Sequence, residues 1–200
     1  MQAFRANEYS QNGEDGVIAE VFRRLAFMGV MSGVGRCCEF GAADGYWLSN
    51  TRALVDRGWT GLFLEASRGQ RVTPENVNDL VPAELDLLSI DIDGNDYAVW
   101  QAYQGTPALV VIEINSGYHP EVDRFAQLGG CNFSLMNKLA AAKGYALVCH
   151  TGNCIYIRKQ WLGVCPDADP TFRRDWNSFI LAARGRSLPP PGLGSTTLRG

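Results

Sequence analysis

Apolar residues along the chain follow two alternating spacings, which predict helices and buried strands in turn. Residues 14–25 place apolar side chains three and four positions apart, which predicts a helix with one apolar face. The residues on that face are Val17, Ile18, Val21, Phe22 and Leu25. Short continuous apolar runs, which are typical of buried strands, lie at 36–42, 61–66, 85–93 and 108–115.

Helical segments separate these runs, and two further strands close the pattern. The helices are expected at 49–58, 95–103 and 134–144, and strands at 145–151 and 154–160 flank a turn at Gly152-Asn153. Apolar strands that alternate with helices predict a mainly parallel sheet covered on both faces. The sequence therefore predicts a Rossmann-like α/β fold whose closing hairpin adds one antiparallel strand.

Two segments interrupt this alternation. Residues 116–133 form a long irregular connection, and loops of that length in a compact domain are often functional. The tail has helical character at 171–185 and then becomes rich in proline and glycine. We therefore expect one domain over 1–165, followed by a C-terminal helix and flexible tail over 166–200.

Composition narrows the class of protein. The chain has 200 residues, of which 46% are hydrophobic and 20% charged, as in ordinary globular domains. The net charge of -3 disfavours a nucleic-acid partner. No apolar run approaches a membrane span, and the polar start lacks the apolar core of a secretion signal. We expect a cytoplasmic protein with no membrane partner.

The six cysteines raise the question of a metal site or disulfides. None of them forms a C-x-x-C pair, and His150 lies near Cys149 and Cys154 without the tight paired spacing of a zinc site. We expect reduced, mostly buried thiols.

Carboxylates follow the predicted strands, and they are the main candidates for chemistry. The positions are Glu39, Glu65, Asp91 with Asp93, and Glu113. In sheets of this kind, ligands bind beyond the carboxyl ends of the strands. An acid at a strand end can also simply cap the next helix, although four such positions together favour a ligand site.

The loop after the first strand argues against a phosphorylated ligand. It reads E-F-G-A-A-D-G, so the chain has neither the G-x-G-x-x-G of a dinucleotide site there nor the G-K-[ST] of a P-loop. Acids suit a cationic nucleoside without phosphates, and S-adenosylmethionine fits that description. Glu65 ends the second strand, where an acid commonly binds ribose hydroxyls.

The chain resembles FkbM-type, class I S-adenosylmethionine-dependent methyltransferases. The motifs that carry the resemblance are EYSQNGEDGVIAEVF, EFGAADGYWLSNTRALVDRGWTGLFLEAS, LLSIDIDGNDYAVW, VVIEIN and SLMNKLAAAKGYALV with IYIRK. Together they span most of residues 8–160. The combination of EFGAADG with LSIDIDGNDYAVW is the most specific part.

The resemblance implies residue roles. Gly41 and Gly45 would let the backbone approach the cofactor, and Glu39 or Asp44 would hold its amino-acid end. Glu65 would bind the ribose. Asp91 and Asp93 would line the methyl-transfer cleft, with Glu113 and Asn115 on the neighbouring strand. The hairpin would supply the antiparallel seventh strand of that fold.

One departure from the family pattern concerns the segment after Glu65. Only ASRGQR separates it from VTPENVNDL, where relatives usually fit a helix and another strand. The sheet is therefore expected to lack an outer strand on that side. The adenine contact, which normally comes from that region, would fall to Asn76 or Asn78.

Three residues are candidate bases for methyl transfer to a hydroxyl: Asp93, His119 and Glu113. The alternative for His119 is an ordinary loop histidine. Asp91, Asp93, Glu113 and Asn115 also offer the oxygen ligands that Mg²⁺ prefers, as some O-methyltransferases require. If no metal binds, we expect Asp93 to cap the following helix.

The sequence does not identify the methyl acceptor. Tyr46 and Tyr118 lie on predicted loops and are candidates for stacking on a sugar. We expect O-methylation of a hydroxylated small molecule or a glycan. The alternatives are a non-catalytic module that binds S-adenosylmethionine or a nucleoside, and an RNA methyltransferase, which the net charge disfavours.

Overall fold

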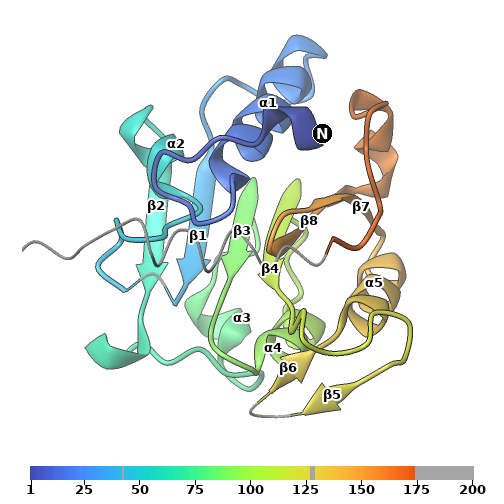
Figure 1. The fold of residues 1–200 in the computed structure, drawn as a ribbon. Coiled ribbons are helices and arrows are strands. Elements are labelled where there is room, and N and C mark those ends of the chain that lie inside the picture. The colour runs from blue at the N-terminus through green and yellow to red at the C-terminus, as the bar shows by residue number, and fades with distance from the viewer. Residues whose placement is uncertain (42, 127–128, 174–200) are drawn as a thin grey trace, which may run out of the picture.

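A six-stranded sheet forms the centre of the molecule (Figure 1). The computed structural model describes residues 1–41, 43–126 and 129–173. The strands lie in the order β2-β1-β3-β4-β8-β7. Their bounds are β1 Arg36–Phe40, β2 Thr60–Leu64, β3 Leu87–Ile90, β4 Leu109–Glu113, β7 Tyr145–His150 and β8 Asn153–Arg158.

Strand direction divides the sheet into two parts. The strands β2, β1, β3 and β4 pair in parallel, whereas β8 is antiparallel to both β4 and β7. The strand β7 therefore runs in the same direction as the first four, and β8 alone in this sheet runs the opposite way. The predicted α/β fold, with a mostly parallel sheet and an antiparallel hairpin strand, is confirmed.

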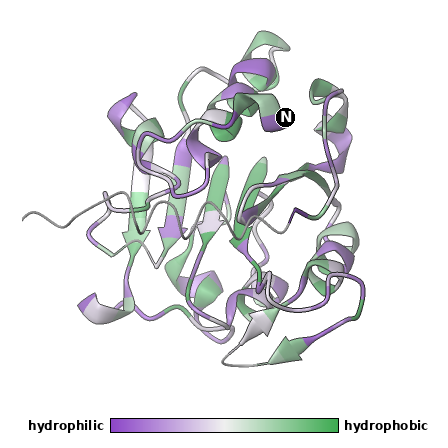
Figure 2. Ribbon diagram, in the orientation of Figure 1, coloured by the Kyte–Doolittle hydropathy of each residue, from purple (hydrophilic) through white to green (hydrophobic). Residues whose placement is uncertain are grey.

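Within the described residues, five α-helices cover the two faces of this sheet. They are α1 Glu14–Phe27, α2 Arg52–Asp56, α3 Val77–Leu80, α4 Asp96–Ala102 and α5 Phe133–Ala142. Apolar side chains of α1 and α2 pack on one face, and those of α3, α4 and α5 pack on the other. Figure 2 shows β3 and β4 as mainly hydrophobic, because both faces of these central strands are covered.

The strand β2 is the edge of the sheet. After it the chain forms only the short 3-10 helix η2, Ala66–Arg68, and then α3 before it enters β3. The expected absence of an outer strand after Glu65 is therefore confirmed for this fully described segment. Because that strand is missing, one side of β2 pairs with no strand of the described chain, and its first residues are exposed.

The long connection after β4 is more ordered than the sequence predicted. It contains a small hairpin of β5, Phe125–Ala126, and β6, Gly130–Cys131. Asn132 is fully buried, and its amide nitrogen donates to the carbonyls of His119 and Val122 at 2.6 and 2.7 Å. Its oxygen accepts from the main-chain N–H of Leu135, so one side chain both shapes the loop and caps α5.

The segment before α1 contains the 3-10 helix η1, Gln2–Phe4. Two buried acids at the start of α1, Glu14 and Asp15, bind this segment and the β7–β8 turn. One carboxylate oxygen of Asp15 accepts from the main-chain N–H groups of residues 8–10 at 2.7 to 2.8 Å. Glu14 accepts from the hydroxyl of Thr151 at 2.8 Å, in the turn between β7 and β8. The EYSQNGED motif therefore folds against the hairpin.

The described chain continues past β8 through the 3-10 helix η3, Lys159–Val164, and packs back on the domain as far as Arg173. The guanidinium of Arg24 in α1 pairs with Asp167 at 2.5 Å. The predicted helix at 171–185 lies, from residue 174 on, outside the described residues. Within the described ranges, no helix has the length and apolar character that a membrane crossing needs.

All six cysteines are free and buried, as expected. Burial raises the pKa of the Cys149 thiol to about 12, so this thiol is protonated at neutral pH. The six buried sulfur atoms contribute to the packing of the domain.

Candidate functional site

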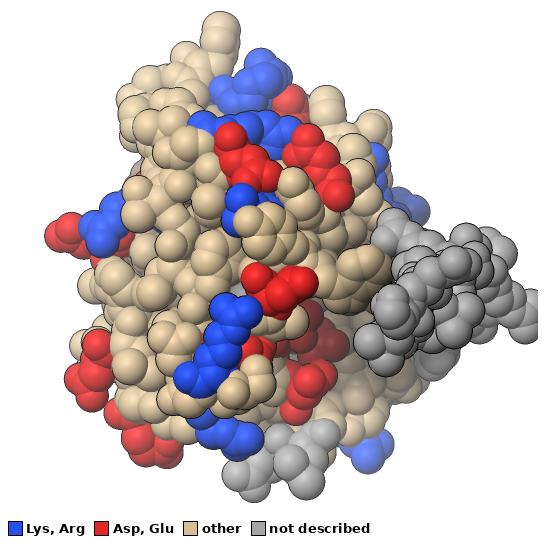
Figure 3. Space-filling view, turned by 90° about the vertical axis from the view of Figure 1, so that its left-hand side faces the viewer, with Lys and Arg blue, Asp and Glu red and all other residues tan. Residues whose placement is uncertain are grey.

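Strand register brings the predicted acids to one edge of the sheet. The last paired positions of the four parallel strands are Phe40, Leu64, Ile90 and Ile112. The residues that follow them are Gly41, Glu65, Asp91 and Glu113. Three carboxylates and one glycine therefore form a row across the carboxyl ends of the strands. Figure 3 shows Asp and Glu side chains gathered around a recess in the middle of that view.

Gly41 occupies the centre of this row because the backbones of β1 and β3 approach closely there. It has a φ of +71°, and a Cβ atom at this position would overlap the carbonyl oxygen of Asp91. Its N–H donates to the carbonyl of Leu64 at 3.1 Å. A side chain is excluded on both conformational and steric grounds.

The carboxylate of Glu39 is used for hydrogen bonds within the protein. It is 4% exposed, and its carboxylate accepts from the Ser49 hydroxyl at 2.5 Å and the Asn50 N–H at 2.7 Å. A third bond comes from the hydroxyl of Thr51 at 2.8 Å. Burial raises the pKa of this carboxyl, and the three donors oppose that shift. Glu39 thus anchors the chain that leads into α2.

Asp44 and Glu65 organise the loop that follows β1. Asp44 accepts from the N–H groups of Tyr46 and Trp47 at 2.8 and 2.7 Å. The bond from Trp47 is the largest cause that lowers the pKa of Asp44, and the bond from Tyr46 adds to it. Glu65 accepts from the N–H of Ser67 at 3.0 Å and of Ala43 at 2.9 Å. These bonds lower the pKa of Glu65, so the carboxylate is ionised at neutral pH and retains lone pairs for a ligand.

Gly45, the other glycine of this loop, has a φ of +80° and lies beside the ring of Phe63 in β2. A Cβ atom there would be 3.7 Å from the ring, which is ordinary contact, so the backbone conformation is what favours glycine.

Asp91 and Glu113 form a close pair at the ends of β3 and β4, with a hydrogen bond between their side chains. Burial is the main cause that raises the pKa of Asp91 to about 7 and of Glu113 to about 8. Neighbouring negative charges add to both shifts. The pair therefore holds a proton near neutral pH, as two carboxyls in one buried site do.

Asp93 extends from this pair toward solvent on a tight turn. It is exposed and has a φ of +56°, the left-handed conformation that Asp tolerates better than most residues. The turn is held by buried Asp96, whose oxygens accept from the N–H groups of Ile92 at 2.8 Å and Gly94 at 3.0 Å. The N-cap of α4 is Asn95, which makes no side-chain capping bond, so the expected capping role of Asp93 is wrong, and Asp96 in the first turn holds the preceding loop instead.

The predicted metal ligands divide into two groups. Asp91, Asp93 and Glu113 each offer an oxygen within 4.8 Å of the others, a spacing suited to one cation. The amide of Asn115 is used in the neighbouring loop, where it accepts from Gly117 N–H at 2.9 Å and donates to the Gly129 carbonyl at 2.8 Å. The three carboxylates are brought together, and Asn115 shapes the loop beside them.

His119 lies in the long loop and is exposed. Its Nδ1 accepts from the N–H of Glu121 at 3.2 Å, which leaves Nε2 as the ring atom for a substrate. The candidate adenine residues are also engaged locally. Asn76 accepts from Thr73 N–H at 2.7 Å, and Asn78 donates to the Ala102 carbonyl at 3.0 Å.

Both tyrosines suggested as sugar-stacking groups carry an arginine over one ring face. Arg52 lies 3.9 Å from the ring centroid of Tyr46, and Arg124 lies 4.2 Å from that of Tyr118. Only the opposite ring face is left for a further stacking partner.

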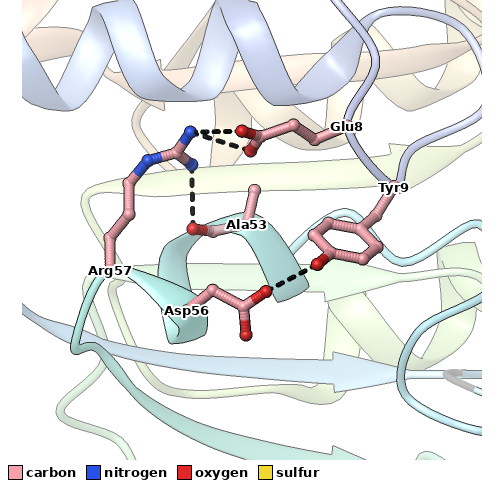
Figure 4. A pocket seen from close by; sticks show the side chains of 5 residues that line it. All are labelled: Glu8, Tyr9, Ala53, Asp56 and Arg57. Atoms are coloured by element: carbon pink, nitrogen blue, oxygen red, sulfur yellow. Dashed lines mark hydrogen bonds and ion pairs between the residues drawn. The ribbon is translucent and has the colours of Figure 1, made fainter.

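A separate shallow pocket of about 280 Å³ lies between the N-terminal segment and α2 (Figure 4). Its polar groups are paired with each other. Tyr9 donates to Asp56 at 2.6 Å, and Arg57 donates to both oxygens of Glu8 at 2.7 and 2.8 Å. These bonds fasten the EYSQ segment to α2 and occupy the charged groups that line the pocket.

Sequence reasoning missed the residues that support the site from outside the strand tips. These are Asp15, Asp96, Asn132 and Asn153. Asp15 and Asp96 had a local signal, because each lies in the first turn of a predicted helix, and Asn132 lies two residues before one. Asn153 had none, because its position opposite Glu113 depends on the pairing of β4 with β8.

Comparison with known proteins leaves the chain without an assigned family. No protein-family model matches it, and no curated protein is similar enough to be a relative.

Proposed function

We propose that this protein is an S-adenosylmethionine-dependent methyltransferase that acts on a hydroxyl of a small molecule or glycan. The observation that carries the proposal is the strand order, in which antiparallel β8 lies between β4 and β7 of a sheet whose other strands all run one way. The resemblance to FkbM-type enzymes implies the same hairpin. The row of acids at the strand ends then supplies chemistry suited to a cationic nucleoside.

Glu65 is the residue proposed to bind the ribose. It directly follows the edge strand β2, is partly exposed, and carries a lowered pKa, so it presents an ionised acceptor to two hydroxyls. Its bond from Ala43 N–H joins it to the glycine-containing loop after β1. This arrangement supports binding of the sugar at Glu65 and of the amino-acid end closer to Gly41. Asp44 remains the candidate for that end, since Glu39 already has three donors.

The acceptor would bind on the side of Asp93 and Glu113. A general base contributes about 10²- to 10⁴-fold when its pKa lies near the working pH. The pKa values of the Asp91–Glu113 pair, about 7 and about 8, meet that condition. We propose that exposed Asp93 orients the acceptor hydroxyl, and His119 is the second candidate base.

Calorimetry with S-adenosylmethionine and with its demethylated product tests the cofactor. We expect both to bind, and Glu65→Ala to weaken binding about 10-fold or more, since hydrogen bonds to a charged group contribute about 1.5–3 kcal/mol. Glu84→Ala, at an exposed position, is the matched control. Failure of well-folded protein to bind either nucleoside would overturn the proposal.

Transfer of labelled methyl groups to a panel of hydroxylated acceptors tests the reaction. Asp93→Asn keeps a residue that tolerates the left-handed turn and should lower turnover roughly 10²-fold with unchanged cofactor affinity. Binding without transfer to any acceptor would instead favour a non-catalytic binding module. Normal turnover of Asp93→Asn would exclude Asp93 as the orienting group, and loss of turnover in His119→Ala would assign the base to His119 instead of the Asp91–Glu113 pair.

A further inference from the structure

Three carboxyl groups meet beyond the ends of β3 and β4. Asp91, Asp93 and Glu113 each place an oxygen within 4.8 Å of the other two. Within the described parts of the chain, none of the three pairs with Lys or Arg. Acids this close repel one another once ionised, so a cation that replaces the shared proton would be bound favourably.

A buried amide lies beside these acids. Asn153 is 8% exposed and pairs directly with Glu113 across the β4–β8 ladder. Directly opposed residues of an antiparallel pair carry their side chains on one face, with Cβ atoms about 4.5–5.5 Å apart. That face is the α1 side, because Val111 and Ile155, two positions along each strand, pack there.

Among the residues that the structure describes, the Asn153 side-chain amide has no hydrogen-bond partner. The bonds that this residue makes there involve its main chain, such as the Thr151 hydroxyl that donates to its carbonyl. Neither amide atom of Asn153 is fully enclosed, so both can reach water or a ligand, and no group of the described chain competes for them. This second observation is independent of the acids, and it places an amide next to Glu113.

The turn that carries Asp93 is rigid enough to serve as part of a binding site. Asp96 accepts from the N–H groups of Ile92 and Gly94 on both sides of Asp93. The carboxylate of Asp93 is therefore displayed from a fixed backbone, on the exposed side of the cluster.

We infer that Asp91, Asp93, Glu113 and Asn153 form a site for one hard divalent cation of the Mg²⁺, Mn²⁺ or Ca²⁺ class. The set consists of carboxylate and amide oxygens, which these ions prefer, and contains no imidazole or thiolate for zinc or copper. The cation would balance the three carboxylates and give the amide oxygen of Asn153 a partner. Its open coordination positions would face the exposed side, toward water or the oxygens of a bound molecule.

This inference does not depend on methyl transfer, because the metal alone is the probe. The full chain is dialysed against EDTA, and Mn²⁺ binding is followed by electron paramagnetic resonance, with Mg²⁺ and Ca²⁺ as competitors. We expect one saturable site, and the competition ranks the three ions. Asp93→Asn should weaken Mn²⁺ binding about 10-fold or more, as loss of even an outer-shell partner does. Asp79→Asn removes the same charge from an exposed position of α3 and should leave binding unchanged.

Variants of Asn153 provide a second test of the same site. Asn153→Ala should weaken Mn²⁺ binding, and Asn153→Asp, which restores an oxygen ligand, should recover it. Added Mn²⁺ should raise the melting temperature of the native protein more than that of Asp93→Asn. This variant should fold, because position 93 is exposed and Asn tolerates its left-handed conformation. Absence of saturable Mn²⁺ binding would overturn the inference. Equal binding in Asp93→Asn, Asp79→Asn and the native chain would overturn it as well.

Discussion

Gly41 lies against the carbonyl oxygen of Asp91, so the first strand can meet the third only if residue 41 has no side chain. We predict that Gly41→Ala lowers the free energy of unfolding by about 2 kcal/mol or more, since left-handed strain alone costs about 1–3 kcal/mol and the overlap adds to it. Urea-induced unfolding measures the change.

Gly69 separates the two causes of that loss. It has a φ of +78°, close to that of Gly41, but within the described chain no atom beyond its two chain neighbours would lie within 4 Å of a Cβ added there. Gly69→Ala therefore reports backbone strain alone and should cost clearly less than Gly41→Ala. Equal losses in the two variants would contradict a steric role for the Asp91 carbonyl.

Glu39 is predicted to stabilise the fold through the start of α2. Glu39→Gln replaces one acceptor oxygen by an NH₂ group that faces the donors of residues 49–51, and should cost about 1–3 kcal/mol. Chemical denaturation measures this loss, and Glu84→Gln, which makes the same change at an exposed acid, is the control. A variant with native stability but lost nucleoside binding would instead assign Glu39 to the cofactor.

The Asp91–Glu113 pair predicts a loss of stability as pH rises. Both carboxyls have folded-state pKa values, about 7 and about 8, above their ordinary values of 3.8 and 4.5. The native state therefore keeps protons that the unfolded chain releases. The stabilisation is fully present below the ordinary values and disappears as pH rises through 7 to 8.

Glu113→Gln tests this pH dependence. The amide cannot ionise, so the variant should lose less stability than the native chain between acidic and alkaline buffer. The groups that face the pair, Asp93, Asp96 and Glu39, are also acidic and remain in the variant. Unfolding is measured with a chelator present, which removes any effect of bound metal. Parallel pH profiles for the two proteins would exclude the pair as the source.

Local pattern was enough to predict the six strands of the main sheet and the helices α1, α2, α4 and α5, because burial on one or both faces leaves a periodic trace in the sequence. It did not predict α3, β5 or β6, which lie in segments expected to be irregular. The helix at Val17 to Leu25 and the strands at 87–90 and 109–113 lie where the apolar spacing predicted them. The structure of the long loop at 116–133 was harder to predict from the sequence, because it depends on buried Asn132 and its contacts with His119 and Val122. Those contacts leave no periodic signal.

The sequence by itself determined that carboxylates stand at the ends of apolar strands, and that no outer strand follows Glu65. Only the tertiary structure decided how these acids differ. Glu39 receives three donors from the chain that leads into α2, whereas Asp91 and Glu113 face each other, and Asn153 joins them from an antiparallel strand. The physical reason is that strand order and register determine which side chains share a face, and hydrogen-bond partners and desolvation then determine the charge each acid carries.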